Sequence, residues 1–153
     1  MRLTNFSDYS IRVLLYLTIH DGQVVQIQEI ADAYGISKNH LMKITHQLGK
    51  MGYIETLRGR NGGMKLAKQP KDINIGELVR KTEEDFYIVE CFSGGHDSCP
   101  ITPVCSLKGV LNQALKSFFQ VLDAYSLEDI TKNKGQLLQY MQRTGEIPGT
   151  EKG

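Results

Sequence analysis

The chain has 153 residues, of which 41% are hydrophobic and 23% charged, with a formal net charge of +1. This ordinary composition favours one soluble globular domain with at most a small addition, and it excludes a repetitive or low-complexity chain. The longest apolar run near the start, residues 11–19, contains Arg12 and is too short to cross a bilayer. We therefore expect a cytoplasmic protein that has no membrane partner.

Charge is unevenly distributed along the chain. Residues 37–71 contain eight lysines and arginines against the single acid Glu55, whereas residues 72–99 contain seven acids against Arg80 and Lys81. A locally basic stretch is the expected electrostatic signature of a nucleic-acid contact, although many basic stretches are only solvated surface. The net charge says nothing about partners, but the basic stretch is a candidate for DNA binding.

Three helices are predicted in the first fifty residues. Apolar residues recur at helical spacing over 11–19, and Asn5 or Ser7 can cap the start of this first helix. Gly35 ends a second amphipathic helix, and Ser37 is a good N-cap for a third. A short connection between two such helices is what a helix-turn-helix motif requires.

The pattern then changes to a short hairpin. Residues 53–57 form a β-branched and aromatic run, 58–63 (RGRNGG) supply turn residues, and 64–67 form a second short strand. Residues 73–85 follow as another short helix. A helix-turn-helix followed by a basic hairpin predicts a mainly α fold with a small β-hairpin, namely a winged helix-turn-helix domain.

A long amphipathic helix is predicted from Val104 to about Tyr125. Its apolar residues alternate in spacing between four and three, which is typical of the seam between two packed helices. The seam consists of Leu107, Leu111, Ala114, Phe118, Val121 and Tyr125. Ser126 can cap a further short helix.

These elements predict a division of the chain. A winged helix-turn-helix domain over 1–82 precedes a loop region over 83–105 that contains all three cysteines of the chain. Residues 106–141 supply a dimerisation helix and short C-terminal helices, and 142–153 form a disordered tail.

Residues suited to DNA contact cluster on the third helix and at the hairpin tip. A recognition helix contacts base edges mainly from its N-terminal part, where amide side chains can pair with adenine and lysine can reach guanine or phosphate. Hairpin arginines suit phosphates or the minor groove. His46 is expected to be a surface or packing residue instead. The candidates are Ser37, Lys38, Asn39, His40, Lys43, Gln47, Arg58, Arg60 and Asn61.

All three cysteines lie within fifteen residues, at Cys91, Cys99 and Cys105. No closely spaced cysteine pair typical of structural zinc is present, and the wide spacing in a loop suits an iron–sulfur cluster better. A fourth ligand could be His96 or Asp97 in the same loop, or a residue elsewhere. No catalytic constellation appears, so the chain is not expected to be an enzyme.

Several blocks resemble the iron–sulfur winged-helix repressors that include IscR, over roughly residues 1–140. They are RLTNFSDYSIRVLLYL, ISKNHLMKI with LGKMGYIETLRGRNGGMKLA, and INIGELVR. Two later blocks, VECFSGGHDSCPITPVCSLKGVLNQAL and VLDAYSLEDI, resemble the nitric-oxide-sensing members of that family. The resemblance implies a homodimer that binds double-stranded operator DNA and carries one [4Fe-4S] cluster per subunit. It further implies that nitric oxide attacks the cluster, by nitrosylation or loss, and so derepresses nitrosative-stress genes.

The resemblance also assigns residues to the cluster. Cys91, Cys99 and Cys105 match the three cluster cysteines, and Asp8 matches an acid that supplies the fourth ligand from the partner subunit in some relatives. A carboxylate is a hard, weak ligand for cluster iron and is easily displaced. Arg12 lies one helical turn further on, where it could hold that carboxylate as an outer-shell partner.

Some features depart from the IscR type. IscR-like members have five residues between the first two cysteines and a histidine soon after the third, whereas here the first gap is seven and no histidine follows Cys105. The alternatives are an IscR-type regulator with a [2Fe-2S] or redox-sensing cluster and, from another class, a zinc-stabilised interaction module. The longer loop leaves Asp8, His96, Asp97 and an exogenous ligand open as the fourth ligand.

Overall fold

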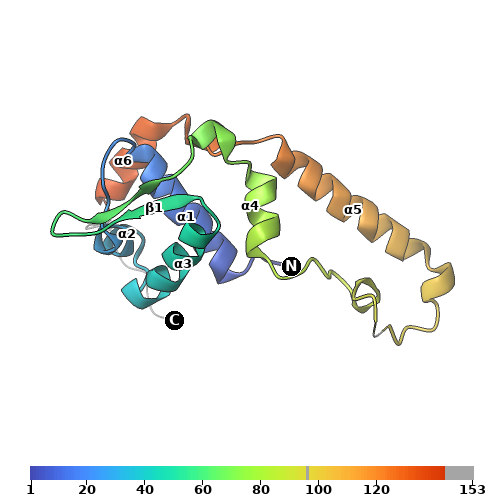
Figure 1. Ribbon diagram of the computed structural model, residues 1–153. Coiled ribbons are helices and arrows are strands. Elements are labelled where there is room, and N and C mark those ends of the chain that lie inside the picture. The colour runs from blue at the N-terminus through green and yellow to red at the C-terminus, as the bar shows by residue number, and fades with distance from the viewer. Residues whose placement is uncertain (96, 144–153) are drawn as a thin grey trace.

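The computed structural model describes residues 1–95 and 97–143, and it consists of a helical body from which one long helix projects (Figure 1). The first part of the body contains three helices, a two-stranded antiparallel sheet, one 3-10 turn and a fourth helix. In chain order these are α1 (Asn5–Ile19), α2 (Ile27–Tyr34), α3 (Lys38–Lys50), β1 (Ile54–Leu57), β2 (Gly63–Leu66), η1 (Pro70–Asp72) and α4 (Ile75–Thr82).

After α4 the chain leaves the body as an irregular segment, residues 83–105, which we call the cysteine arm. It then returns along α5, and two short helical segments end the described chain. These elements are η2 (Glu90–Phe92), η3 (Thr102–Val104), α5 (Ser106–Asp123), η4 (Asp129–Thr131) and α6 (Lys134–Gln142). The tail predicted to be disordered over 142–153 begins in the last residue of α6, and from 144 it lies outside the described residues.

The cap of α1 differs from the sequence-based expectation. Thr4, not Asn5 or Ser7, is the N-cap, and its hydroxyl accepts a hydrogen bond of 3.3 Å from the backbone N–H of Ser7. Ser7 itself is fully buried and its hydroxyl donates to Thr82 of α4 instead. Ser7 lies inside the first turn of α1, so Thr4, the extended residue directly before the helix, occupies the N-cap position.

The helix-turn-helix predicted from the sequence is present. Gly35 ends α2 in the left-handed conformation with φ of +63°, which a residue without Cβ adopts easily. Ser37 caps α3 by accepting a hydrogen bond of 3.2 Å from the backbone N–H of His40. Ile30 and Leu41 are completely buried and belong to the same core, so α2 and α3 pack through their apolar faces.

The hairpin pairs Ile54 with Leu66 and Leu57 with Gly63. Its second strand is also held to the loop between α1 and α2, because Met64 and Val25 exchange backbone hydrogen bonds of 2.8 and 2.9 Å. These bonds attach β2 to the body close to the turn, and the tip projects beyond them (Figure 1).

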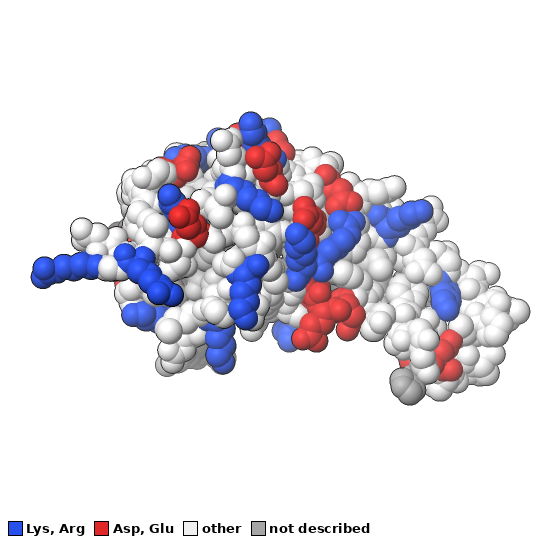
Figure 2. Space-filling model, in the orientation of Figure 1, with Lys and Arg blue, Asp and Glu red and all other residues white. Residues whose placement is uncertain are grey.

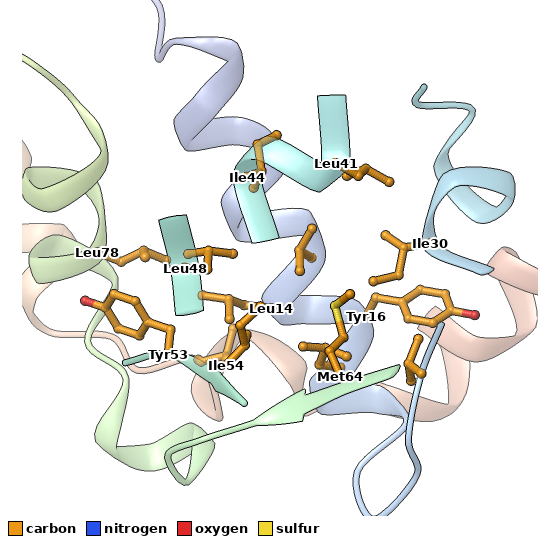
Figure 3. Packing of buried hydrophobic residues seen from close by; sticks show 14 of the residues in the cluster. Leu14, Tyr16, Ile30, Leu41, Ile44, Leu48, Tyr53, Ile54, Met64 and Leu78 are labelled. Atoms are coloured by element: carbon orange, nitrogen blue, oxygen red, sulfur yellow. The ribbon is translucent and has the colours of Figure 1, made fainter. Parts of the chain in front are cut away.

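One hydrophobic core joins the helices and the hairpin (Figure 3). Burying a large aliphatic side chain contributes about 1.5–3 kcal/mol, so this cluster dominates the stability of the body. The segment after α5 belongs to the same core, because Leu127 is fully buried and its N–H donates to the carbonyl of Ile73. The fully buried side chains of the cluster include Leu14, Ile30, Leu41, Leu48, Tyr53, Ile73, Leu78 and Leu127.

By contrast, α5 has no buried residue within the described chain. Leu107 and Val121 of the predicted seam are each 60% exposed, and Tyr125 just beyond the helix is 49% exposed. The mainly helical fold with a small hairpin confirms the predicted fold class. Among the described residues, no helix is long and apolar enough to cross a membrane.

Candidate DNA-binding surface and metal centre

The surface of α3 carries the side chains that the sequence suggested for DNA contact. Leu41, Ile44, Thr45 and Leu48 are buried and fix the inner face of the helix. This packing turns the remaining positions outward. The predicted candidates Ser37, Lys38, Asn39, His40, Lys43 and Gln47 are all exposed.

The burial pattern also defines the centre of the outward face. Successive residues of an α-helix are rotated by 100°, so Asn39, Lys43 and His46 form one line opposite the buried residues. His46 is exposed, as expected, but it lies on the same line as two of the DNA-contact candidates. Met42, 53% exposed, borders this line and was not singled out from the sequence. The signal that could have identified Met42 is its position, four residues after Lys38, which places it on the same side of the helix.

The hairpin tip presents the remaining candidates. Arg58, Arg60 and Asn61 are exposed between the two strands. The tip is tight: Gly59 has φ of +113°, and a Cβ at Gly62 would collide with the carbonyl oxygens of Leu57 and Gly59. The glycines therefore allow a narrow turn that carries two arginines at its end.

Basic side chains project from the hairpin end of the face shown in Figure 2 and lie on the surface beside it. The lysines of α3 and the arginines of the hairpin tip thus belong to two elements that pack against each other. A surface of this kind attracts the phosphate backbone of a nucleic acid.

Asp8 and Arg12 form an ion pair near the start of α1. The guanidinium donates through Nε to Oδ1 at 3.1 Å and through Nη2 to Oδ2 at 2.8 Å. The side chain of Arg12 is 39% exposed and that of Asp8 is 42% exposed, so the carboxylate remains accessible from solvent. A two-point arginine–carboxylate contact fixes orientation as well as charge.

Arg12 also connects α1 with its neighbours. Its guanidinium carbon lies 5.6 Å from the ring centroid of Tyr9 and 5.8 Å from that of Tyr34 in α2. The Tyr9 ring in turn lies 6.3 Å from the ring of His40 at the start of α3. Burial raises the pKa of Tyr34 to about 12, so this ring stays neutral at physiological pH. Side chains around Asp8 therefore contact both helices of the helix-turn-helix.

The cysteine arm carries the three thiols as free cysteines. Cys91 lies in η2, Cys99 is exposed in irregular chain, and Cys105 immediately precedes α5. Within residues 1–95 and 97–143, no three histidine, cysteine, aspartate or glutamate side chains converge in an arrangement that could hold a metal ion. His96 lies outside the described residues.

Polar contacts shape the arm between the first two cysteines. Glu90 accepts hydrogen bonds from the backbone N–H and the hydroxyl of Ser98, at 3.3 and 2.7 Å. Asp97 accepts one from the N–H of Cys99 at 3.1 Å, a local turn that engages its carboxylate. Glu90 was not singled out from the sequence, and its position directly before Cys91 was the only signal.

The donor set of the arm fits an iron–sulfur cluster. Three unbridged thiols supply soft ligands, and such clusters are held by cysteine thiolates. The hydroxyl of Thr102, three residues from both Cys99 and Cys105, is buried without a hydrogen-bond partner in the described part of the chain. A hydroxyl in this position could donate to cluster sulfur.

The root of the arm is fastened to the start of α1. Ser7 donates to the hydroxyl of Thr82 at 2.7 Å, and the N–H and hydroxyl of Thr4 donate to Glu83 at 2.7 and 3.0 Å. A hollow of about 690 Å³ lies beside this contact. Its walls are formed by residues 1–4, residues 83–88 and two residues of α5, Leu115 and Phe118.

Comparison with known proteins points to one family. Residues 3–133 match Rrf2, described as an iron-dependent transcriptional regulator. The chain is 54% identical over 138 residues to the HTH-type transcriptional regulator NsrR of Bacillus licheniformis, covering 90% of this chain and 96% of that protein. The regulator of the same name from Bacillus subtilis is 53% identical over 143 residues, covering 93% and 98%.

Solved structures share the fold. The structure of T. potens IscR aligns with a TM-score of 0.70 at 25% identity, covering all of this chain and 94% of that one. The oxidized form of Staphylococcus aureus CymR aligns with a TM-score of 0.69 at 21% identity, covering 86% and 97%. At that identity the second likeness shows the fold alone.

Proposed function

The chain belongs to the Rrf2 family of iron-dependent transcriptional regulators, and from this premise we propose that it is a homodimeric repressor that releases operator DNA when nitric oxide reacts with its iron–sulfur cluster. Its relatives are named transcriptional regulators, which confirms that the chain is a regulator of the IscR and NsrR type and not an enzyme. The observation that carries the finer proposal is the free three-cysteine arm rooted beside Asp8.

DNA is the partner of the α3 surface and the hairpin tip in this proposal. Asn39, Lys43 and Gln47 lie in the major groove, while Arg58 and Arg60 contact phosphates or the adjacent minor groove. The exposure of these side chains, and the basic surface at the hairpin end of the body, support this assignment.

The second copy of the chain covers the exposed seam of α5. Within one subunit, Leu107, Val110 and Val121 of α5 are each 60% exposed, and leaving such large apolar side chains in water is costly. Packing two such helices along Leu107, Leu111, Ala114, Phe118 and Val121 removes that cost and pairs two bodies.

Cys91, Cys99 and Cys105 would hold the cluster, with Asp8 of the partner subunit as the fourth ligand. A [4Fe-4S] cluster is favoured over [2Fe-2S]. When bound, the cluster supplies iron with which nitric oxide reacts. As a hard oxygen donor among soft thiolates, Asp8 would be the most easily displaced of the four ligands. Arg12 offers the released carboxylate two hydrogen bonds, at the distances it already makes.

The route to DNA runs through α1. When Asp8 changes partner, Arg12 moves with it, and Arg12 contacts Tyr9 and Tyr34. Tyr9 lies against His40 on the DNA-binding helix. A change in the partner of Asp8 would thus reach α2 and α3 through side-chain contacts of Arg12 and Tyr9.

Spectra and DNA binding together test this proposal. The protein is purified without oxygen, and its visible absorption, Mössbauer spectrum and affinity for duplexes selected by the protein itself are measured before and after nitric oxide. We expect a [4Fe-4S] spectrum and at least about a tenfold loss of specific affinity on exposure, a typical size for a coupling of this kind. Equal affinity of the two forms would disprove the switch. A colourless, zinc-loaded protein without salt-dependent DNA affinity would favour the interaction module.

Asp8→Ala and Asp97→Asn separate the candidate fourth ligands. If Asp8 is the ligand, its replacement changes the spectrum and the lifetime of the cluster in air, whereas Asp97→Asn, which keeps an oxygen that can accept from the N–H of Cys99, leaves the spectrum unchanged. An unaltered spectrum in Asp8→Ala transfers the assignment to the arm or to an exogenous ligand.

A further inference from the structure

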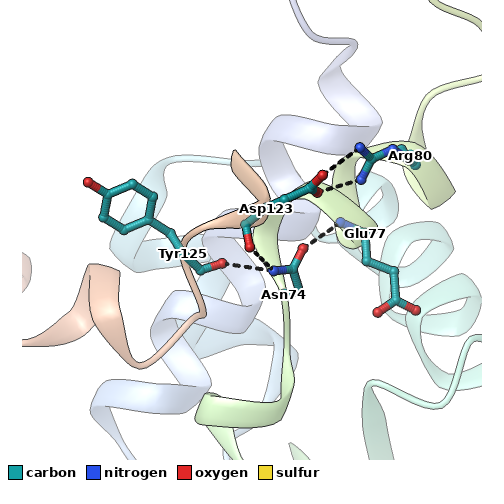
Figure 4. A network of polar contacts seen from close by, with 5 residues as sticks. All are labelled: Asn74, Glu77, Arg80, Asp123 and Tyr125. Atoms are coloured by element: carbon teal, nitrogen blue, oxygen red, sulfur yellow. Dashed lines mark hydrogen bonds and ion pairs between the residues drawn. The ribbon is translucent and has the colours of Figure 1, made fainter. Parts of the chain in front are cut away.

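The C-terminal end of α5 is fixed to α4 by a compact polar network (Figure 4). Arg80 donates from Nη1 and Nη2 to the two carboxylate oxygens of Asp123, at 2.6 and 2.8 Å. The same guanidinium lies 4.2 Å from the ring centroid of Phe119, one turn earlier in α5. Arg80 is thus held by α5 from two directions, which fixes the direction of the helix relative to α4.

Asn74 completes the network from the other end of α4. Its side-chain oxygen caps α4 by accepting from the N–H of Glu77 at 2.9 Å. Its amide nitrogen donates to the carbonyl of Asp123 at 2.8 Å, with a longer contact of 3.4 Å to the carbonyl of Tyr125. One side chain therefore joins the start of one helix to the end of another.

Close packing leaves this contact little freedom. A Cβ on Gly76 would collide with the carboxylate of Asp123 and approach its backbone nitrogen at 3.0 Å. The backbone of Ile75 donates to Tyr125 at 3.0 Å, so main chain and side chains hold the same two segments together. We call Asn74, Gly76, Arg80 and Asp123 the α4–α5 junction.

The length of α5 makes the angle at this junction important. Eighteen residues extend about 27 Å, so a change of about 10° at one end displaces the other by about 5 Å. Successive base pairs are separated by about 3.4 Å, and dimeric regulators bind half-sites at a defined separation. A small error in angle is therefore larger than one step along DNA.

We propose that the α4–α5 junction sets the direction in which each body hangs from the paired α5 helices, and thereby determines the spacing of the two operator half-sites. The inference rests on the proposed function, since it requires a dimer through α5 and DNA contact through α3. Arg80, Asp123 and Gly76 act as positioning residues, because in this proposal none of them contacts DNA.

Selection from a random DNA pool tests the inference without a known operator. The full-length dimer and its variants Arg80→Ala and Gly76→Ala are each used to select duplexes, and sequencing gives the distribution of spacings between inverted half-sites. For the unaltered protein we expect one dominant spacing. In the variants the fraction of duplexes with that spacing falls at least about threefold, or the preferred spacing shifts by a base pair or more.

Lys81→Ala is the matched control. Lys81 pairs with Glu77 on the same helix and with similar exposure, but this ion pair lies within α4 and does not reach α5. Its spacing distribution should equal that of the unaltered protein. Affinity for a single isolated half-site should stay within about twofold in all variants, because α3 and the hairpin are unchanged.

Each outcome bears on one claim. If the unaltered protein selects no spaced half-sites, the proposed function fails. If it selects them and the two junction variants keep the same distribution as dimers, the inference alone is wrong. Loss of dimer mass in both variants also overturns it, because the network would then support association and not direction.

Discussion

The hydroxyl of Ser7 donates a hydrogen bond of 2.7 Å to the hydroxyl of Thr82, inside the protein and seventy-five residues further along the chain. Thr82 passes the bond on by donating to the carbonyl of Leu78 at 3.0 Å. Both residues are buried, at 0% and 5% exposure. This contact joins the helix that bears Asp8 to the root of the cysteine arm.

Breaking this contact should destabilise the body. Thr82→Val leaves the buried Ser7 hydroxyl without its acceptor, and we expect the free energy of unfolding to fall by about 1–3 kcal/mol. Urea titration of the metal-free protein measures the change. Ser7→Ala/Thr82→Val should cost less than the sum of the two single variants, because both remove one bond. Additive effects would show that the two hydroxyls are energetically independent.

The salt dependence of DNA binding should report the hairpin arginines. If Arg58 and Arg60 each contact a phosphate, replacing either with alanine lowers the slope of log affinity against log salt by about 0.9. The measurement is a set of binding titrations between about 50 and 200 mM salt. Lys116→Ala removes a charge from the projecting helix α5 and should leave the slope unchanged. An unaltered slope in both arginine variants would remove the hairpin from the DNA surface.

Asp129 should contribute stability that depends on pH. A hydrogen bond from Lys132, together with the N–H and hydroxyl of Ser126, holds the pKa of Asp129 well below its usual range. Because the folded pKa is lowered, this contribution is present above the unfolded pKa of about 3.9 and is lost as the pH falls further. Asp129→Asn should therefore lower the thermal midpoint at pH 7, and the difference should shrink below about pH 4. A pH-independent difference would contradict this account.

Leu127 should behave as a core residue of the body although it follows α5. Leu127→Ala removes a completely buried side chain, and we expect a loss of about 2–5 kcal/mol in the free energy of unfolding, in a single transition. Val104→Ala, at a position 82% exposed in the cysteine arm, should change it by less than about 0.5 kcal/mol. An early, separate transition in Leu127→Ala would show instead that the end of the chain folds independently.

Local patterns predicted the elements of the body well. Helical spacing of apolar residues, the Ser37 cap and the Gly35 stop are decided within a few residues, and they appear where the sequence indicated. The cap of α1 was assigned wrongly because the helix already begins at Asn5, so the residue directly before it is Thr4. The hydrogen bonds of Ser7 with Thr82 and of Asn74 with Asp123 join residues too far apart in sequence to be foreseen.

In the candidate site, too, some features follow from local sequence patterns and others do not. Exposure of Lys38, Asn39 and Lys43 follows from the helical period, so the sequence could indicate the outward face of α3. The ion pair of Asp8 and Arg12 follows from their spacing of four residues on one helix. The three cysteines lie in irregular chain, which has no repeating geometry from which their relative positions could be predicted. The cluster ligands therefore stay a prediction.

The exposure of α5 has a consequence for local unfolding of the chain. The end of α5 is held to its own body by the α4–α5 junction and by Phe119 and Leu122, which pack against the core. The cysteine arm and the first half of α5 have no buried residue in the described chain, so we expect their local unfolding free energy to be lower than that of the core helices. If two copies pair through α5, amide protons of this part should exchange more slowly in a concentrated solution than in a dilute one.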